Sequence, residues 1–263
     1  MIDYHIHTEL CNHAVGSMPD YVQRAVELGF REICFLDHLT LQEAGARLSM
    51  TPGEVPLYFQ AVQRLKLQFK DRIRVKAGLE VDFNPIYVAM IEDIIGTYAF
   101  DVIGSSLHFP QGVDVVNSAS EWAGGKMDTD YIFRVYLENL VKMMDYTYFD
   151  IICHMDLPKK FGRKPSRPLE SELDHLIKRI RDRDLTVELN TSGFHHVLQE
   201  PYPSPEILKR CCSAGITVTL GSDSHRPRDV GRSYDKAFAV LKAAGYREVA
   251  VFDKRRRSMI PLT

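Results

Sequence analysis

The chain has 263 residues, 45% of them hydrophobic, and a formal net charge of only −2. Barrels of about 250 residues fold as one unit, so we expect residues 1–263 to form a single domain. The small net charge predicts no general attraction to nucleic acid or to an acidic membrane.

Seven short runs rich in β-branched and other apolar residues recur along the chain, and each ends near a polar residue. They cover residues 1–5, 32–38, 74–81, 100–108, 149–154, 185–190 and 216–223. Runs of this length are typical of strands that are buried on both faces. The sequence therefore predicts seven strands.

Segments with helical spacing of apolar residues lie between these runs. The first follows Ser17, a typical N-cap residue, and ends at Gly29. A second follows Asp128, a third carries apolar residues over 173–180, and a fourth ends at Gly215. We assign these apolar faces to the hydrophobic core and not to a cofactor site.

The alternation of strands and helices predicts an α/β fold with a parallel sheet. Seven repeats in this length suggest a barrel related to the (β/α)8 fold, irregular or one unit short. An open doubly wound sheet is the alternative. No GxGxxG motif opens a helix after the first strand, which argues against dinucleotide binding.

The five cysteines do not form a disulfide framework. Their number is odd, no CxxC pair occurs, and two of them are adjacent at Cys211 and Cys212. This pattern fits a reducing compartment. The N-terminus lacks a signal-peptide pattern, and no apolar run approaches membrane-spanning length. We therefore expect a cytoplasmic protein without a membrane partner.

Nearly every predicted strand ends on a residue that can bind a metal ion or move a proton. The C-terminal ends of parallel barrel strands converge on one face, where active sites form. Residues far apart in the sequence can therefore share one site. The residues in question are His5, His7, Asp37, His38, Glu80, His108, His154, Asn190, Asp223 and His225.

The spacing of these residues favours a metal cluster. His5 and His7 are two apart on a strand, so both side chains point to the same face, and Asp223 and His225 repeat the spacing. Imidazole and carboxylate ligands suit zinc, iron or manganese. Each residue has an ordinary alternative, such as a core histidine or a salt bridge, but one cluster explains all positions together.

These residues, in this order, resemble the PHP family of polymerase and histidinol phosphatase domains. "DYHIHT", "LDH", "GLE", "SLH", "CHMD" and "GSDSH" are similar to the successive motifs of the family. The resemblance covers essentially the whole chain. It implies a distorted (β/α)7 barrel, TIM-barrel-like, with three divalent metal ions (zinc, manganese or iron) at the C-terminal ends of the strands.

The resemblance also implies which residues bind each ion. His5, His7, Glu80 and Asp223 would hold the first ion. Glu80 would bridge to a second ion held by His108 and His154. The third ion would be held by His13, His38 and His225. No ligand position of the family is missing from the sequence.

Further stretches, "CHMDLPKKFGRKP", "ELNTSG" and "SDSHRPRDVG", look like the histidinol-phosphatase branch. That branch hydrolyses histidinol phosphate to histidinol and phosphate in histidine biosynthesis. Its substrate is a small phosphorylated metabolite. Where the branch typically carries an arginine after "NTSG", this chain has His195. The candidate substrate contacts are Lys160, Arg163, Asn190, His195 and Arg226.

The chemical hypothesis is hydrolysis of a phosphate monoester by a hydroxide that bridges metal ions. Glu80 would bridge the ions, Asp223 would orient or deprotonate the water, and Asp37 would protonate the leaving oxygen. One alternative is a phosphoesterase for another small ester such as a nucleotide. A 3′–5′ exonuclease is less favoured because no extended basic stripe is present, and a non-enzymatic module would have lost ligands.

Overall fold

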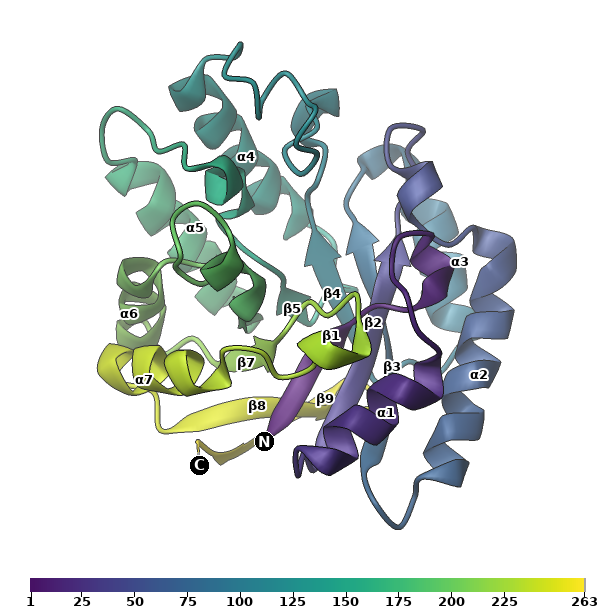
Figure 1. Ribbon diagram of the computed structural model, residues 1–263. Coiled ribbons are helices and arrows are strands. Elements are labelled where there is room, and N and C mark those ends of the chain that lie inside the picture. The colour runs from purple at the N-terminus through teal and green to yellow at the C-terminus, as the bar shows by residue number, and fades with distance from the viewer. Residues whose placement is uncertain (263) are drawn as a thin grey trace.

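The computed structural model describes residues 1–262, and its centre is a sheet of seven parallel strands in sequential order (Figure 1). The strands are β1 (Ile2–Ile6), β2 (Glu32–Leu39), β3 (Arg74–Asp82), β4 (Val102–Ser106), β5 (Ile151–Ile152), β6 (Thr186–Asn190) and β7 (Val218–Gly221). All seven predicted strands are confirmed.

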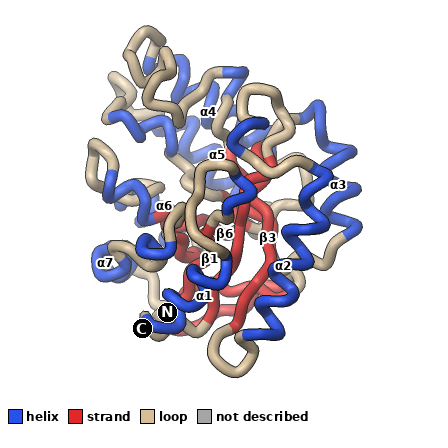
Figure 2. Tube along the Cα trace, turned by 45° about the vertical axis from the view of Figure 1, so that its right-hand side comes forward, coloured by secondary structure: helices blue, strands red, loops and turns tan. Residues whose placement is uncertain are grey.

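The first and last strands of this sheet meet along a seam. The amide of His7 donates to the carbonyl of Ser224 at 3.0 Å, and the amide of Ser224 donates to the carbonyl of His5 at 3.2 Å. These bonds bring the two edges of the sheet together, so the strands form a nearly closed barrel (Figure 2). The predicted barrel is confirmed, and the open doubly wound sheet is wrong.

Helices surround the barrel (Figures 1 and 2). They are α1 (Met18–Glu27), α2 (Val55–Gln68), α3 (Val88–Thr97), α4 (Thr129–Met143), α5 (Glu170–Asp182), α6 (Pro205–Ser213) and α7 (Tyr234–Ala244). α1 begins after Ser17, whose side chain forms a capping box with Asp20, and Gly29 follows its end in a left-handed conformation at φ 73°. No helix among residues 1–262 is long and apolar enough to cross a bilayer.

Two glycines make room for a large side chain inside the barrel. A Cβ at Gly78 would lie 2.6 Å from a methyl carbon of Leu36, and one at Gly104 would lie 2.9 Å from the other methyl carbon. Leu36 therefore fills the barrel interior across strands β3 and β4. One layer nearer the C-terminal ends, the register places His38 beside Glu80. The interior thus changes from apolar to ligand-bearing within two residues.

A β-hairpin that was not predicted covers the other end of the barrel. It consists of β8 (Glu248–Asp253) and β9 (Arg256–Pro261), paired antiparallel. Thr219 of β7 donates its hydroxyl to the carbonyl of Ala250 at 2.9 Å, and Tyr4 of β1 donates to the carbonyl of Phe252 at 3.2 Å. In Figure 1 the hairpin runs across the ends of the strands opposite the site described next.

Candidate metal centre

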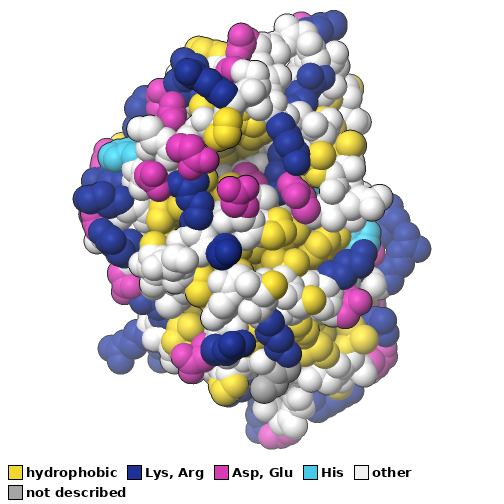
Figure 3. Space-filling model, turned by 90° about the vertical axis from the view of Figure 1, so that its left-hand side faces the viewer, with side chains coloured by type: hydrophobic (Ala, Val, Ile, Leu, Met, Phe, Trp, Pro, Cys, Tyr) yellow, Lys and Arg dark blue, Asp and Glu magenta, His cyan; other side chains and the backbone are white. Residues whose placement is uncertain are grey.

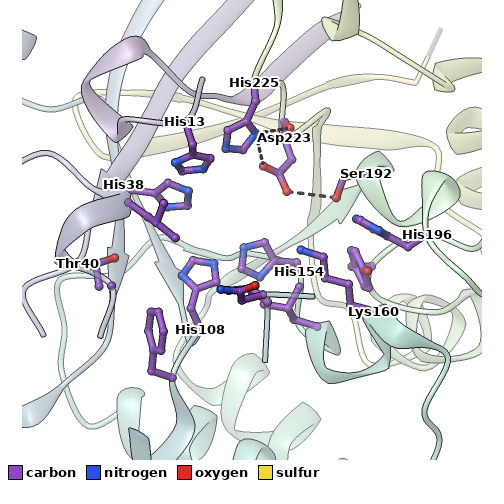
Figure 4. Close-up of a pocket in the computed structure, with 17 residues that line it drawn as sticks. His13, His38, Thr40, His108, His154, Lys160, Ser192, His196, Asp223 and His225 are labelled. Carbon is purple, nitrogen blue, oxygen red and sulfur yellow. Dashed lines mark hydrogen bonds and ion pairs between the residues drawn. The ribbon is translucent and has the colours of Figure 1, made fainter. Parts of the chain in front are cut away.

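The nine predicted metal ligands meet at the C-terminal ends of the strands. A cavity of about 370 Å³ lies there, and six of the nine side chains line it (Figure 4). These six are His13, His38, His108, His154, Asp223 and His225. The other three, His5, His7 and Glu80, are fully buried and contact the lining residues.

The first group of side chains consists of His5, His7, Glu80 and Asp223. Nε2 of His5 lies 3.4 Å from Oε2 of Glu80 and 4.0 Å from Oδ1 of Asp223. Nε2 of His7 lies 3.0 Å from the same Asp223 oxygen and 3.8 Å from Oε2 of Glu80. Two imidazole nitrogens and two carboxylate oxygens thus face one another at distances that one divalent ion can span.

The second group uses the other oxygen of Glu80. Oε1 of Glu80 lies 2.6 Å from Nε2 of His154 and 3.6 Å from Nε2 of His108. The two oxygens of Glu80 therefore face different histidines, as a bridging carboxylate requires. The buried position of Glu80 near the C-terminal end of β3 produces this arrangement.

The third group consists of His13, His38 and His225. Their ring centroids are 5.3 Å apart between His13 and His38, 4.5 Å between His13 and His225, and 5.9 Å between His38 and His225. Nδ1 of His13 lies 2.7 Å from the carbonyl oxygen of Cys11, and Nδ1 of His225 lies 3.1 Å from the carbonyl oxygen of Asp223. If each Nδ1 carries the proton and donates it to that carbonyl, Nε2 remains free to bind an ion.

Several polar atoms of the centre are buried without a hydrogen-bond partner among the described residues. Among them are Nε2 of His5, Nδ1 of His38, Oε2 of Glu80 and Nε2 of His225. The His38 and Glu80 atoms are only 2.6 Å apart, yet they are not oriented for a hydrogen bond. Buried polar atoms without partners are costly. Convergent lone pairs of this kind fit divalent ions, which would satisfy them.

The charge state of Glu80, Asp223 and His13 suits metal binding, whereas His5 and His7 hold protons. Burial opposes ionisation of Glu80, but His38 and the other surrounding histidines outweigh it and hold the pKa of this carboxyl well below its usual range. The pKa of Asp223 is likewise lowered against burial, by His5 and His7. Burial and the charge on His38 lower the pKa of His13 to about 4. At neutral pH the two carboxylates are ionised and His13 is neutral, which are the forms that bind metal ions. Against burial, Glu188 and Glu80 raise the pKa of His5 well above its usual range, and Asp223 and Asp37 raise the pKa of His7 to about 9. An ion that binds these two histidines must therefore displace a proton from each.

Two of the predicted ligands have left-handed backbone conformations. His154 has a φ of 27° and Asp223 a φ of 54°. Residues with side chains rarely adopt this region, and such strain is concentrated at functional sites. The surrounding contacts must therefore hold both residues in place.

Among the other predicted site residues, Lys160 lines the cavity. It lies in the 3-10 helix Leu157–Phe161, and Figure 4 shows its side chain on the side of the cavity where Ser192 and His196 lie. Burial lowers the pKa of its amine. No carboxylate of the described residues forms an ion pair with it, in contrast to Lys159, which pairs with Asp156 at 2.8 Å.

Arg163 lies away from the cavity. Its Nε donates to the carbonyl of Trp122 at 2.8 Å, one of its terminal nitrogens donates to the carbonyl of Ala123 at 3.1 Å, and its guanidinium lies 5.4 Å from the centroid of the Trp122 ring. Trp122 is fully buried, and its indole donates to the carbonyl of Pro158 at 3.1 Å. Arg163 and Trp122 thus anchor two loops to each other.

The remaining predicted contacts also lie outside the cavity lining. Arg226 and His195 are exposed, and Nε2 of His195 lies 3.0 Å from the hydroxyl of Ser233. Asn190 is buried, and its amide donates to Asp223 at 3.3 Å. Asp37 is buried, with Oδ1 3.2 Å from Nδ1 of His7, and its other oxygen accepts from the amide of Thr8 at 3.1 Å.

Sequence reasoning missed two residues near the centre. His196, next to His195, lines the cavity, and burial and the charge of Lys160 lower the pKa of its ring to about 4. Glu188, on β6, is buried with Oε1 2.6 Å from Nδ1 of His5. A signal for Glu188 was present, because it lies two residues before Asn190 and so faces the same side of the strand.

A second cavity, of about 580 Å³, lies between helices α4, α5 and α6. Its apolar lining includes Phe133, Tyr136 and Leu173, and its rim includes Lys164 and Arg210. Figure 3 shows the face of the molecule on this side, where lysine, arginine and acidic side chains surround apolar ones. None of the predicted site residues lines it.

Histidinol-phosphatases from other organisms are similar to this chain over nearly its whole length. A probable histidinol-phosphatase from Deinococcus radiodurans is 31% identical over 99% of both chains, and a histidinol-phosphatase from Lactococcus lactis is 25% identical over 98% of both chains. The crystal structure of histidinol phosphate phosphatase from Lactococcus lactis, complexed with zinc, L-histidinol and phosphate, has a TM-score of 0.84 at 24% identity and covers 98% of each chain.

The structure of a putative histidinol phosphatase from Listeria monocytogenes has a TM-score of 0.81 at 24% identity, and covers 90% of this chain and 99% of its own. These two structures share the fold of this chain. A family model described as the PHP domain matches residues 3–192. The chain therefore belongs to the PHP domain family.

Proposed function

We propose that this protein is a metal-dependent phosphomonoester hydrolase that converts L-histidinol phosphate and water to L-histidinol and phosphate. The observation that carries the proposal is the complete set of nine converging ligands beside a cavity lined by Lys160, a half-buried lysine that forms no ion pair with a carboxylate of residues 1–262. The relatives with 31% and 25% identity over nearly their whole lengths support the substrate.

The three groups of side chains would each hold one divalent ion. Zinc, manganese and iron all accept imidazole and carboxylate ligands, and zinc is the ion named for the Lactococcus lactis structure. When bound, such ions supply an activated water nucleophile at neutral pH and positive charge for the phosphoryl oxygens.

Asp223 is the residue that we assign to the attacking water. One of its oxygens faces His7, and the other accepts from the hydroxyl of Ser192 at 3.1 Å and from the amide of Asn190 at 3.3 Å. These contacts fix the plane of the carboxylate at the edge of the cavity. Because its pKa is held well below the usual range, Asp223 is ionised at neutral pH and can accept a hydrogen bond from water.

Lys160 and His196 are the residues that we assign to the substrate. Within residues 1–262 the Lys160 ammonium has no competing carboxylate partner, so its charge is available to a phosphate oxygen. His196 is neutral at pH 7 and can donate one hydrogen bond. Both line the cavity on the same side as Ser192, as Figure 4 shows.

The remaining predicted residues receive supporting roles in this proposal. Asp37 is too deeply buried to reach a leaving group, and we assign it to holding His7. Asn190 holds Asp223, and Arg163 holds the Trp122 loop. His195 and Arg226 are exposed and receive no contact with the bound substrate.

We also propose that the chain acts as one domain, in the cytoplasm, on a small metabolite, without a nucleic-acid or membrane partner. One continuous hydrophobic core supports the single domain, and five free cysteines support a reducing compartment.

A substrate panel tests the proposed function. Purified protein loaded with zinc or manganese would be assayed for phosphate release from histidinol phosphate, a nucleoside monophosphate and a sugar phosphate. We expect kcat/KM to be highest for histidinol phosphate. Faster release from the nucleotide, with little from histidinol phosphate, would refute the substrate while leaving the phosphoesterase chemistry.

A further inference from the structure

Glu188 lies beneath the centre and contacts ligands of two different groups. It is on β6 and is only 1% exposed. Its Oε1 lies 2.6 Å from Nδ1 of His5, which belongs to the first group. Its Oε2 accepts the backbone amide of His154 at 2.9 Å, and His154 belongs to the second group. The side-chain amide of Asn190 donates to the same oxygen at 3.1 Å.

The contact with His5 selects one form of the imidazole ring. A neutral imidazole carries its proton on one nitrogen only. If that proton sits on Nδ1 and is donated to Glu188, Nε2 keeps its lone pair and faces Glu80 and Asp223. A carboxylate behind a ligating histidine fixes the ring in this way and increases its basicity.

The contact with His154 acts on the backbone. His154 adopts a φ of 27°, which is unfavourable for a residue with a side chain. Its amide bond to Glu188 helps to hold this conformation, from which the ring reaches Glu80 at 2.6 Å. One carboxylate thus fixes a ligand ring of the first group and a ligand backbone of the second.

Gly221, on β7, leaves the space that this arrangement needs. A Cβ at this position would lie 2.0 Å from Oε1 of Glu188 and 2.6 Å from Cβ of His5. Any side chain here would collide with both members of the pair. The requirement for glycine is therefore one of close approach, because φ of Gly221 lies outside the left-handed region.

We propose that Glu188 is a positioning residue that couples the first two metal sites, and that Gly221 leaves the space for its contact with His5. This inference rests on the proposed metal centre. Glu188 does not line the cavity and so has no contact with the substrate.

The sharpest test is Glu188→Gln, which keeps the shape of the side chain but replaces one acceptor by a donor. If the amide oxygen accepts from His154, the amide nitrogen must donate to Nδ1 of His5. The His5 proton then moves to Nε2, the atom that faces Glu80 and Asp223. We expect zinc affinity to fall roughly 10- to 100-fold in competition with a chelator. Nitrogen NMR of the imidazole rings in the zinc-bound protein should show the change in which nitrogen of His5 carries the proton.

Glu32→Gln is the matched control. Glu32 is also a buried carboxylate on a barrel strand, 2% exposed, but it pairs with Arg74 at 2.7 Å, far from the ligands at the opposite end of β2. This variant should bind zinc like the wild type. Gly221→Ala is the second variant, because it displaces the Glu188–His5 pair without removing a polar group, and it should also weaken zinc binding.

The outcomes separate this inference from the proposed function. Wild-type zinc affinity and an unchanged His5 tautomer in Glu188→Gln would overturn the positioning role, even in an active phosphatase. A wild-type protein that binds zinc but does not hydrolyse histidinol phosphate would overturn the function, while weaker zinc binding by Glu188→Gln would still support the positioning role.

Discussion

Replacement of Lys160 by methionine tests how the cavity binds a phosphate group. The substitution keeps an unbranched side chain of similar length but removes the ammonium. Because Lys160 lines the cavity and forms no ion pair with a carboxylate of the part of the chain that the structure describes, its loss leaves no such partner unsatisfied in the free protein. The effect should therefore appear in catalysis and not in folding.

The magnitude follows from the contact that is lost. A hydrogen bond between a charged donor and a phosphate oxygen contributes about 1.5–3 kcal/mol, which corresponds to a loss of about 10- to 150-fold in kcat/KM. The adjacent Lys159 cannot replace the lost ammonium, because its own ammonium already contacts Asp156 at 2.8 Å, Glu200 at 3.1 Å and the carbonyl of Pro201 at 2.7 Å.

The assay is steady-state phosphate release from histidinol phosphate, with zinc content and melting temperature measured in parallel. Lys164→Met is the matched control, since it removes the same charge from an exposed position four residues away. An unchanged kcat/KM in Lys160→Met, with wild-type zinc content, would refute the assignment.

The pH dependence gives the same test a second measurement. Burial lowers the pKa of Lys160, so the ammonium is present below that pKa and is lost as the pH rises through it. As the pH is raised, KM of the wild type should therefore increase at a lower pH than that at which an exposed lysine loses its proton. Lys160→Met should lack this rise, and Lys164→Met should keep it.

Three further predictions concern the centre and its surroundings. Glu80→Gln removes the bridging carboxylate, so metal content should fall and turnover should drop by roughly 100-fold or more. Wild-type turnover at a confirmed low metal content would contradict the multimetal mechanism. His196→Ala should raise KM roughly fivefold by loss of one neutral hydrogen bond, while His195→Ala should leave the kinetics unchanged. The reverse pattern would mean that His195, and not His196, contacts the substrate. Arg163→Ala should lower the free energy of unfolding by about 1–2 kcal/mol and Tm by about 2–8 °C with kcat unchanged, because two hydrogen bonds to the Trp122 loop are lost. An unchanged Tm with a higher KM would instead indicate that Arg163 contacts the substrate.

The strand order and the convergence of the ligands could be predicted because both depend on short-range periodicity. Side chains two apart on a strand share a face, and parallel barrel strands end on one face. His5, His7 and Glu80 therefore meet regardless of the conformations of the loops. The hairpin β8–β9 was missed although the apolar run 249–252 is a local signal for a strand; no local pattern indicates that the hairpin covers the barrel end.

The residues around the substrate were less predictable because they lie beyond the strand ends. His195 and His196 belong to the end of a 3-10 helix, where the two-residue periodicity of β6 no longer applies. The sequence therefore could not say which of the two faces the cavity. Arg163 follows the 3-10 helix that carries Lys160, but a left-handed Gly162 turns the chain between them.

The seam between β1 and the segment after β7 sets the order in which metal sites can arise during synthesis. The second group is complete once His154 has been made, whereas the first and third groups wait for Asp223 and His225. At about 5–20 residues per second, the 71 residues between positions 154 and 225 take about 4–14 s to synthesise. With the proposed ligands, two of the three ions would be loaded only after barrel closure joins the oldest and youngest strands of the sheet. Their arrival would mark the end of folding, and not its beginning.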